Sequence, residues 1–365
     1  MDIVLLILVL VALILVHELG HFVAAKLAGM RVLEFGVGYP PRAARIAKKG
    51  ETEYTLNWLP FGGFVRIFGE DGEATDTKGR AFTDKNRFAQ AIVLVAGIAM
   101  NLLFAWVLIS GSLLAGTPRA LDPEEIASAP DARITVSDIL PGSPADTAGL
   151  VGGDVIVHAF SGEETFAAPD PAAFTEFIAQ DGVETPITFD IRRNGEQLVL
   201  SVLPEKGVIA SDPSRPAIGI AVAVVGTVPL SWYEAPVLGA EYTWALTKAT
   251  AVGLAHFFGS IFTFSADFSQ IAGPVGIAGA VGTASDAGLS SLVTLTAIIS
   301  INLALINLIP VPALDGGRLL FVLIESVTRK RIKPAVAGAM NTIGFLLLLL
   351  LMVVVTAHDI WKIVA

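Results

Sequence analysis

Residues 3–25 read IVLLILVLVALILVHELGHFVAA, an apolar run that is interrupted by His17, Glu18 and His21 near its end. At a rise of about 1.5 Å per residue, a helix of this length reaches roughly 34 Å, which is enough to cross a bilayer. Asp2 stands where a secretory signal peptide carries basic residues, and no small-residue cleavage site precedes a polar stretch. We therefore expect a retained membrane helix.

The composition of the whole chain supports a membrane protein. Of its 365 residues, 53% are hydrophobic and only 16% are charged, with a mean hydropathy of +0.68. Ordinary soluble domains have about 25% charged residues, so a wholly soluble or disordered chain is excluded. The net charge of −10 gives no basic footprint for nucleic acid. Without cysteine, a metal site would have to use His, Asp or Glu.

Charge predicts how the chain crosses the membrane. Further apolar runs begin at Ala91, Leu292 and Ala335. The loop 26–90 carries 11 Lys and Arg residues, and basic residues also fill the connection before Ala335. By the positive-inside rule both lie in the cytoplasm. The segment 116–291 carries 21 acidic residues against 7 basic ones and belongs outside, so both termini face outside as well.

These limits define the expected organisation. The segments are a first span (1–25), a cytoplasmic loop (26–90), a second span (91–115), a linker (116–131), a folded domain (132–205), an extracytoplasmic region (206–291), a third span (292–314), a cytoplasmic connection (315–334), a fourth span (335–357) and a C-terminal tail (358–365). Short β-type runs around a helical run at 171–179 predict an α+β domain over 132–205.

The stretch Thr247 to Phe264 is open to two interpretations. It is apolar enough to suggest a fifth span, but it contains Lys248 and His256. A fifth span would also place the basic connection 315–334 outside, against the charge rule. We interpret it as an amphipathic helix that lies along the membrane surface.

The polar cluster in the first span has the spacing of a metal site. His17 and His21 are four residues apart and share one helical face, so both imidazoles can bind one ion. Glu18 lies beside them and can act as a general base on metal-bound water. Chance would produce such a pattern in about 0.3% of chains of this composition. The alternative is a helix end whose polar groups reach the interface, but each ionisable group costs at least roughly 2.5–3.5 kcal/mol inside a span.

Asp315 is the candidate for a third ligand. It follows the third span, which runs parallel to the first, so its carboxylate should reach a depth similar to that of the two histidines. Pro310 and Pro312 interrupt the helix before it, and broken backbone is tolerated in a membrane where it lines a cavity. The alternative is a simple turn, because Asp-Gly-Gly is a strong turn signal.

The two motifs together resemble those of a known family. HELGH at 17–21 and NLIPVPALDGG at 307–317 are similar to the motifs of the site-2 protease family of intramembrane zinc metalloproteases, of the bacterial RseP type (peptidase family M50). The resemblance covers nearly the whole chain. It extends to LPFGGFV at 59–65, to GPVGI at 273–277 and to a PDZ-like pattern between Gly142 and Ile156.

This resemblance implies one zinc ion per chain, held by His17, His21 and Asp315, with Glu18 activating water. It implies a polytopic α-helical membrane protein with four transmembrane helices, a membrane-associated β-hairpin and one extracytoplasmic α+β PDZ domain. Its place would be the bacterial cytoplasmic (inner) membrane, with the active site near the cytoplasmic side. Some family members have two tandem PDZ domains, whereas this sequence accommodates one.

A hydrophobic hairpin is expected between Glu53 and Glu70, with its turn at Phe61, Gly62 and Gly63. The resemblance implies that it dips into the membrane and pairs its edge with an extended substrate. The alternative is a small sheet on the cytoplasmic surface.

Two asparagine side chains of the third span also have two possible roles. Asn302 and Asn307 could hold unwound substrate backbone, or could form hydrogen bonds between helices. Asn101 has the same ambiguity, and we place it outside the predicted site.

As to activity, the resemblance implies an intramembrane endopeptidase that acts on single-span membrane proteins such as anti-sigma factors and remnant signal peptides. The PDZ domain would gate their access. The alternative is a membrane-anchored PDZ scaffold or chaperone with a non-catalytic metal site, although such a site has no need of a base like Glu18. A transporter is not supported, because the spans are few and no paired broken helices occur in repeated halves.

Overall fold

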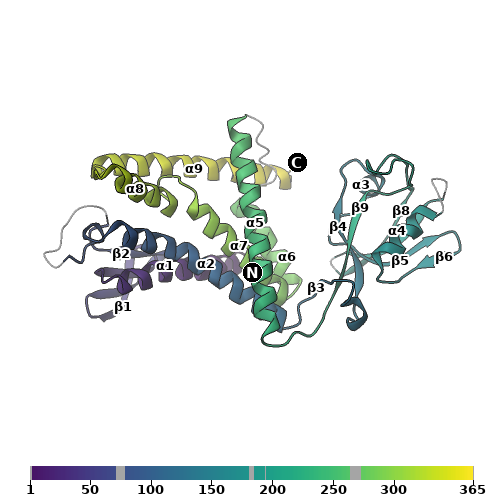
Figure 1. Cartoon of the computed structure of the whole chain (residues 1–365), viewed down its shortest axis with the longest axis horizontal. Helices are drawn as coiled ribbons and strands as arrows, with labels where there is room; N and C mark the ends of the chain where they lie inside the picture. Colours follow the sequence, from purple (N-terminus) through teal and green to yellow (C-terminus); the bar gives the residue numbers. More distant parts are fainter. Residues whose placement is uncertain (1, 71–78, 181–184, 194, 264–272, 365) are drawn as a thin grey trace. The chain divides into compact units, whose positions relative to one another are not determined.

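The computed structural model describes residues 2–70, 79–180, 185–193, 195–263 and 273–364. The chain divides into two compact units. The larger unit comprises Met1–Ser112 together with Tyr233–Ala365, and the smaller one is Leu113–Trp232. Figure 1 shows the elements of each unit, which are described separately below.

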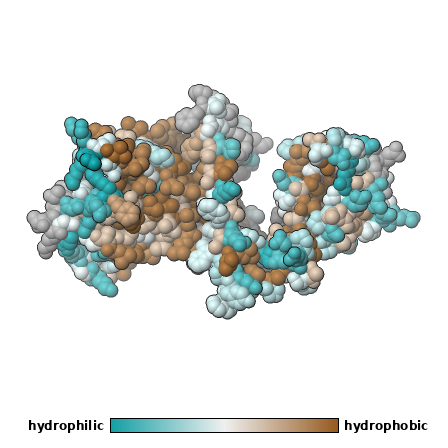
Figure 2. Space-filling view, viewed as in Figure 1, coloured by the Kyte–Doolittle hydropathy of each residue, from teal (hydrophilic) through white to brown (hydrophobic). Residues whose placement is uncertain are grey.

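Helices dominate the larger unit. They are α1 (Asp2–Leu27), α2 (Arg87–Leu114), α5 (Glu234–Phe262), α6 (Pro274–Asp286), α7 (Leu289–Leu308), α8 (Asp315–Thr328) and α9 (Pro334–Val364), with a 3₁₀ turn at Phe82–Asp84. Four of them, α1, α2, α7 and α9, are long and apolar enough to cross a membrane, which agrees with the expected number of spans. The third of them, α7, ends at Leu308, before the predicted limit at 314. Figure 2 shows hydrophobic side chains gathered over this helical part.

The long helix α5 covers most of the stretch from Thr247 to Phe264, for which the sequence leaves two interpretations open. It begins at Glu234, well before the predicted start at Thr247, and Phe264 lies outside the described residues. Among the described residues, α5 is not one of the helices that meet the criteria for a membrane span. The interpretation as a surface helix stays a prediction.

Two long strands form the sheet of the larger unit. β1 (Val32–Lys49) and β2 (Thr52–Ile67) are antiparallel, and both bend so strongly that residues 34–37 pair with 63–66 on one side and with 53–56 on the other. The result is a sheet of four segments in the order 63–67, 32–38, 52–57 and 42–49. The segment 63–67 is therefore an edge strand.

This sheet lies along α1. The ring of Phe22 on α1 packs against Phe35 at a centroid distance of 5.5 Å. Near the C-terminal end of α1, the Lys26 ammonium donates to the Thr52 hydroxyl over 2.7 Å. At the other end of the sheet, a Cβ added to Gly63 would lie 3.3 Å from a methyl group of Leu15. The sheet thus runs from the end of α1 to its middle. The predicted hairpin within Glu53–Glu70 is wrong, because its expected turn at Phe61–Gly63 lies within β2. Residues 53–56 and 63–66 do not pair with each other but lie on either side of residues 34–37.

The smaller unit is an antiparallel sheet covered by a helix. Its strands are β3 (Arg119–Ala120), β4 (Arg133–Ile139), β5 (Val155–Ser161), β6 (Glu164–Phe166), β7 (Ile187–Arg193), β8 (Glu196–Val202) and β9 (Ile220–Gly226), and its helices are α3 (Pro144–Thr147), α4 (Pro171–Gln180) and a 3₁₀ turn at Ile126–Ser128. The strand order is β3-β9-β4-β5-β7-β8, and β6 pairs with β5. β9 lies beyond the predicted domain 132–205, whose limits and PDZ assignment stay predictions.

The core of the smaller unit follows from alternation along the strands. Ile187, Phe189 and Ile191 point inward from β7 and are fully buried. Phe174 and Phe177 of α4 pack against this layer. Because side chains alternate across a strand, the residues between the three buried positions of β7 point away from this core.

One ion pair anchors the turn before β5 to the end of β7. The fully buried carboxylate of Asp154 accepts two hydrogen bonds of 2.7 Å from the guanidinium of Arg193 and one of 2.9 Å from the Val151 amide. Burial alone would raise the pKa of this carboxyl, but the Arg193 and Val151 hydrogen bonds and the Arg193 charge outweigh it, so the pKa is lowered.

Asp154→Asn should destabilise the smaller unit by about 2 kcal/mol at pH 7, because it removes the negative charge from a buried ion pair. The loss is moderate because the Arg193 side chain is 29% exposed, so its charge is partly hydrated. A lowered pKa in the folded state gives stability that is present above the unfolded value of about 3.9 and is lost as the pH falls through the folded value. The stabilities of the variant and the unsubstituted protein should therefore begin to converge as the pH falls below about 4, and meet only below the folded-state pKa of Asp154. Hydrogen exchange of β5 and β7 peptides, compared between the two proteins at each pH, measures this; equal protection at pH 7 would contradict it.

Candidate active site

Two glycines let the helices that form the site approach closely. A Cβ added to Gly20 on α1 would lie 2.3 Å from the carbonyl oxygen of Ala96 on α2. A Cβ added to Gly97 on α2 would lie 2.4 Å from His21 Nε2 and 2.8 Å from His17 Nε2. Since such distances exclude any side chain, both imidazoles rest directly on the backbone of α2.

A break in the third span brings Asp315 to the same place. α7 ends at Leu308, and α8 begins at Asp315 after the proline-containing segment. A Cβ added to Gly316 or Gly317 would lie 2.3 Å from carbonyl oxygens of the segment Leu308–Val311. The Asp-Gly-Gly sequence is thus needed to fold the first turn of α8 back against the broken backbone.

The three predicted ligands converge. His17 Nε2 lies 2.8 Å from Asp315 Oδ2, His21 Nε2 lies 3.1 Å from the same oxygen, and the two Nε2 atoms are 3.1 Å apart. His17 and His21 are buried, with exposed fractions of 6% and 8%. Two imidazole nitrogens and one carboxylate oxygen around one point are a donor set that fits a catalytic metal with one open position.

Hydrogen bonds to α2 orient both imidazoles. His21 Nδ1 donates to the carbonyl oxygen of Val93 over 2.8 Å. The Nε2 lone pair of a neutral His21 therefore faces the convergence point. His17 Nδ1 lies 3.2 Å from Nδ2 of Asn101.

Glu18 lies beside these groups and contacts the edge strand of the hairpin. A Cβ added to Gly63 on this strand would lie 3.8 Å from the Cγ atom of Glu18. A cavity of about 360 Å³ opens next to it, and its lining comprises Glu18, His21, Tyr39, Gly63, Phe64, Val65, Arg66, Ile67, Glu70, Val93, Leu94, Ala313, Asp315 and Arg318. The edge strand 63–67 thus forms one wall of the cavity that holds the candidate base.

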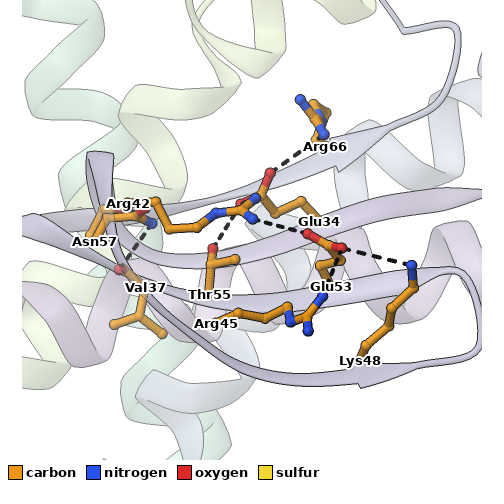
Figure 3. Close-up of polar contacts among 10 residues, drawn as sticks. Glu34, Val37, Arg42, Arg45, Lys48, Glu53, Thr55, Asn57 and Arg66 are labelled. Atoms are coloured by element: carbon orange, nitrogen blue, oxygen red, sulfur yellow. Dashed lines mark hydrogen bonds and ion pairs between the residues drawn. The ribbon is translucent and has the colours of Figure 1, made fainter.

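A polar network fixes this edge strand to the rest of the sheet (Figure 3). The Glu34 side chain is only 7% exposed and accepts hydrogen bonds of 2.8 Å from both Thr55 and Arg42. Arg66 on the edge strand lies 3.5 Å from its other oxygen. Arg42 also bonds Glu53 over 3.0 Å. The buried carboxylate of Glu34, on the segment 32–38, therefore connects this segment with the other three segments of the sheet.

The predicted substrate-binding residues lie in different surroundings. Gly63 lines the cavity, and Gly62 lies against the ring of Tyr39. Asn302 and Asn307 are half-buried on α7 and are not among the residues that line the cavity. Phe61 belongs to β2, but its side chain lies outside the described part of the structure. The assignment of these residues to substrate binding stays a prediction.

Sequence reasoning left Asn101 outside the site, yet the structure places its amide against His17. A usable signal was the spacing of Gly97 and Asn101, which puts them on one face of the second span together with Val93. Without knowledge of which face meets the first span, this stripe could not be told from an ordinary helix contact.

Comparison with known proteins identifies the family. The model of peptidase family M50 matches residues 5–351, so this chain belongs to that family. A relative from Clostridium perfringens, provisionally assigned as a zinc metalloprotease, is 35% identical over 96% of this chain and 95% of its own length. The zinc metalloproteases RasP of Geobacillus kaustophilus and Oceanobacillus iheyensis are 30% and 29% identical, each over 96% of both chains. The resemblance to the site-2 protease family is confirmed.

Gly97→Ala should abolish metal binding, because the new methyl group would occupy the space of both imidazole Nε2 atoms. Gly111→Ala on the same helix is the matched control, since a Cβ added there would have no atom within 4 Å. Metal content of the two purified variants, measured by inductively coupled plasma mass spectrometry, tests this. Full metal content in Gly97→Ala would show that the imidazoles do not hold the ion where the structure places them.

Proposed function

We propose that this chain is an intramembrane zinc endopeptidase that cuts the membrane-spanning segments of single-span proteins. The observation that carries the proposal is the convergence of Asp315, at the start of α8, with His17 and His21 next to Glu18 on α1, a helix apolar enough to cross a bilayer. Membership of peptidase family M50 supports peptide-bond hydrolysis, and the names of the relatives support zinc as the metal.

The residues present fit a zinc ion, with His17 Nε2, His21 Nε2 and a carboxylate oxygen of Asp315 as its ligands. When bound, zinc polarises a carbonyl oxygen and lowers the pKa of a water molecule. Glu18 acts as the general base: its carboxylate takes a proton from the attacking water and returns it to the nitrogen of the leaving peptide. The Glu18 side chain lines the same cavity as the edge strand 63–67.

The edge strand provides a means of holding the substrate. In lipid, the amides of a helix are bonded within the helix, so the scissile bond becomes accessible only after local unwinding. The edge strand 63–67 pairs with residues 32–37 on one side and lines the cavity of Glu18. Its other side can accept an extended peptide by strand addition. We assign Phe61, Gly62 and Gly63 to this contact, with Asn302 and Asn307 as further amide partners.

Charge supports a defined orientation in a bacterial cytoplasmic membrane. The Lys26 end of α1 and the basic connection after α8 would lie at the cytoplasmic side, and the smaller unit with both termini outside. An extracytoplasmic PDZ domain would then admit substrates whose outer part has already been removed. Anti-sigma factors and remnant signal peptides are the substrate classes that the family resemblance suggests.

Glu18→Gln should lower cleavage by at least about a hundredfold while zinc remains bound, because it removes the base and leaves the three ligands. The assay uses full-length protein in liposomes with a single-span substrate trimmed on its outer side. Glu163→Gln, an exposed substitution in the smaller unit, is the control and should leave activity unchanged.

Three results would contradict parts of this proposal. Cleavage that survives Glu18→Gln would remove the base assignment. Full activity in the presence of a strong chelator would remove the metal mechanism. Zinc binding without cleavage of any trimmed substrate would instead favour a membrane-anchored scaffold or chaperone.

The absence of native cysteine allows a direct test of orientation. Glu163→Cys should react with a membrane-impermeant maleimide in intact spheroplasts, because the smaller unit is expected outside. Lys330→Cys should react only after the membrane is opened. Labelling of both positions in intact spheroplasts would contradict the assigned topology.

A further inference from the structure

One face of α2 serves both imidazoles of the site. Val93, Gly97 and Asn101 are spaced by four residues, so they form a single stripe along the helix. The first supplies a carbonyl oxygen to His21 Nδ1, the second leaves space for both rings, and the third places its amide against His17 Nδ1. The two histidines are therefore held from the same element but by different chemical groups.

The Asn101 amide lies in an arrangement that matches one tautomer of His17. Its Nδ2 lies 3.2 Å from His17 Nδ1, while its Oδ1 is buried and has no hydrogen-bond partner among the described residues. An NH₂ group only donates, so in this arrangement Nδ1 of His17 is the acceptor.

Metal ligation requires the opposite tautomer. A ligating Nε2 must present its lone pair, so the ring proton of neutral His17 has to sit on Nδ1 and needs an acceptor there. For His21 the Val93 carbonyl already meets this need. A half-turn of the Asn101 amide would exchange Nδ2 for the unpartnered Oδ1 and provide the same acceptor to His17.

We propose that Asn101 is a positioning residue for His17. With its amide turned so that Oδ1 faces the imidazole, it accepts the proton that Nδ1 carries when Nε2 binds the metal. The residue acts through His17 and touches neither metal nor substrate. This proposal rests on the metal site of the proposed function and adds to it the group that sets the state of one ligand.

The surroundings of Asn101 suit this task. The residue is fully buried, and its backbone carbonyl accepts a hydrogen bond of 2.8 Å from the hydroxyl of Ser300 on α7. Asn101 therefore joins α1, α2 and α7 at the level of His17. Because Ser300 bonds the backbone of Asn101 and not its amide, rotation of the amide is a local movement that need not displace the helices.

The test compares zinc affinity in full-length, metal-depleted protein in detergent, measured by competition with a chromogenic chelator. Asn101→Leu keeps a similar volume but removes both polar atoms, and should weaken zinc binding about 10- to 100-fold. Asn101→Asp keeps an acceptor, and should bind zinc at least as tightly as the unsubstituted protein. Ser110→Ala, which removes another buried polar atom from α2, should change nothing.

A spectroscopic readout separates positioning from mere packing. In protein labelled with ¹⁵N-histidine, zinc-loaded His17 should show a protonated Nδ1 in the unsubstituted protein and in Asn101→Asp. In Asn101→Leu this signal should be lost or exchange-broadened. The His21 signals, which depend on Val93, should stay unchanged.

Each outcome is decisive. Wild-type zinc affinity in Asn101→Leu would overturn the proposal. If that variant fails to fold, Asn101→Asp decides the question. A zinc affinity of Asn101→Asp that is weakened 10- to 100-fold, as expected for a lost hydrogen bond, would overturn the proposal too. Absence of zinc binding in the unsubstituted protein would instead overturn the proposed function on which this inference rests.

Discussion

The close contact between α1 and α2 is the constraint on which the site depends. Gly20 and Gly97 remove the side chains that would keep the two backbones apart. Small residues are the usual means of close packing between membrane helices, where no hydrophobic force drives association. Here the contact also sets the chemistry, because the imidazoles lie on α2 and take their hydrogen-bond partners from it.

The broken third span completes this arrangement from another direction. The proline-containing segment leaves backbone groups unpaired within α7 and α8, which is costly at membrane depth unless other parts of the protein contact them. Hydrogen bonds meet part of this need: the Leu314 N–H donates to the Val311 carbonyl oxygen, and the Ala313 N–H donates to Asn341 Oδ1 on α9. Glycines allow the close packing: Gly316 and Gly317 on α8, and Gly344 on α9, whose added Cβ would lie 2.1 Å from the Pro312 carbonyl oxygen. The position of Asp315 therefore depends on three helices rather than on its local turn alone.

The predictions from sequence succeeded where a strong local pattern coincided with a strong physical cost. The four apolar helices were evident from uninterrupted apolar runs. The convergence of the candidate ligands His17, His21 and Asp315 was evident from ionisable groups in or directly after such runs. The position of Asn101 against His17 was not evident, because an isolated amide in a span is equally suited to contact between helices. The double pairing of β1 was also hidden, since a bend in a long strand leaves no clear signature in the alternation of side chains.

The Glu34 network shows how the edge strand keeps its place although no strand among the described residues pairs with its outer side. Arg66 and Arg42 meet one carboxylate from different segments, and Thr55 adds a hydroxyl, so the sheet is braced from the face opposite Phe35.

A sheet edge that binds an extended peptide only through its backbone groups does not discriminate among most side chains. Under the proposed function, selection among substrates would then depend on how easily a membrane-spanning helix unwinds. Glycine or asparagine in the middle of the span would matter more than a consensus sequence around the cleavage site.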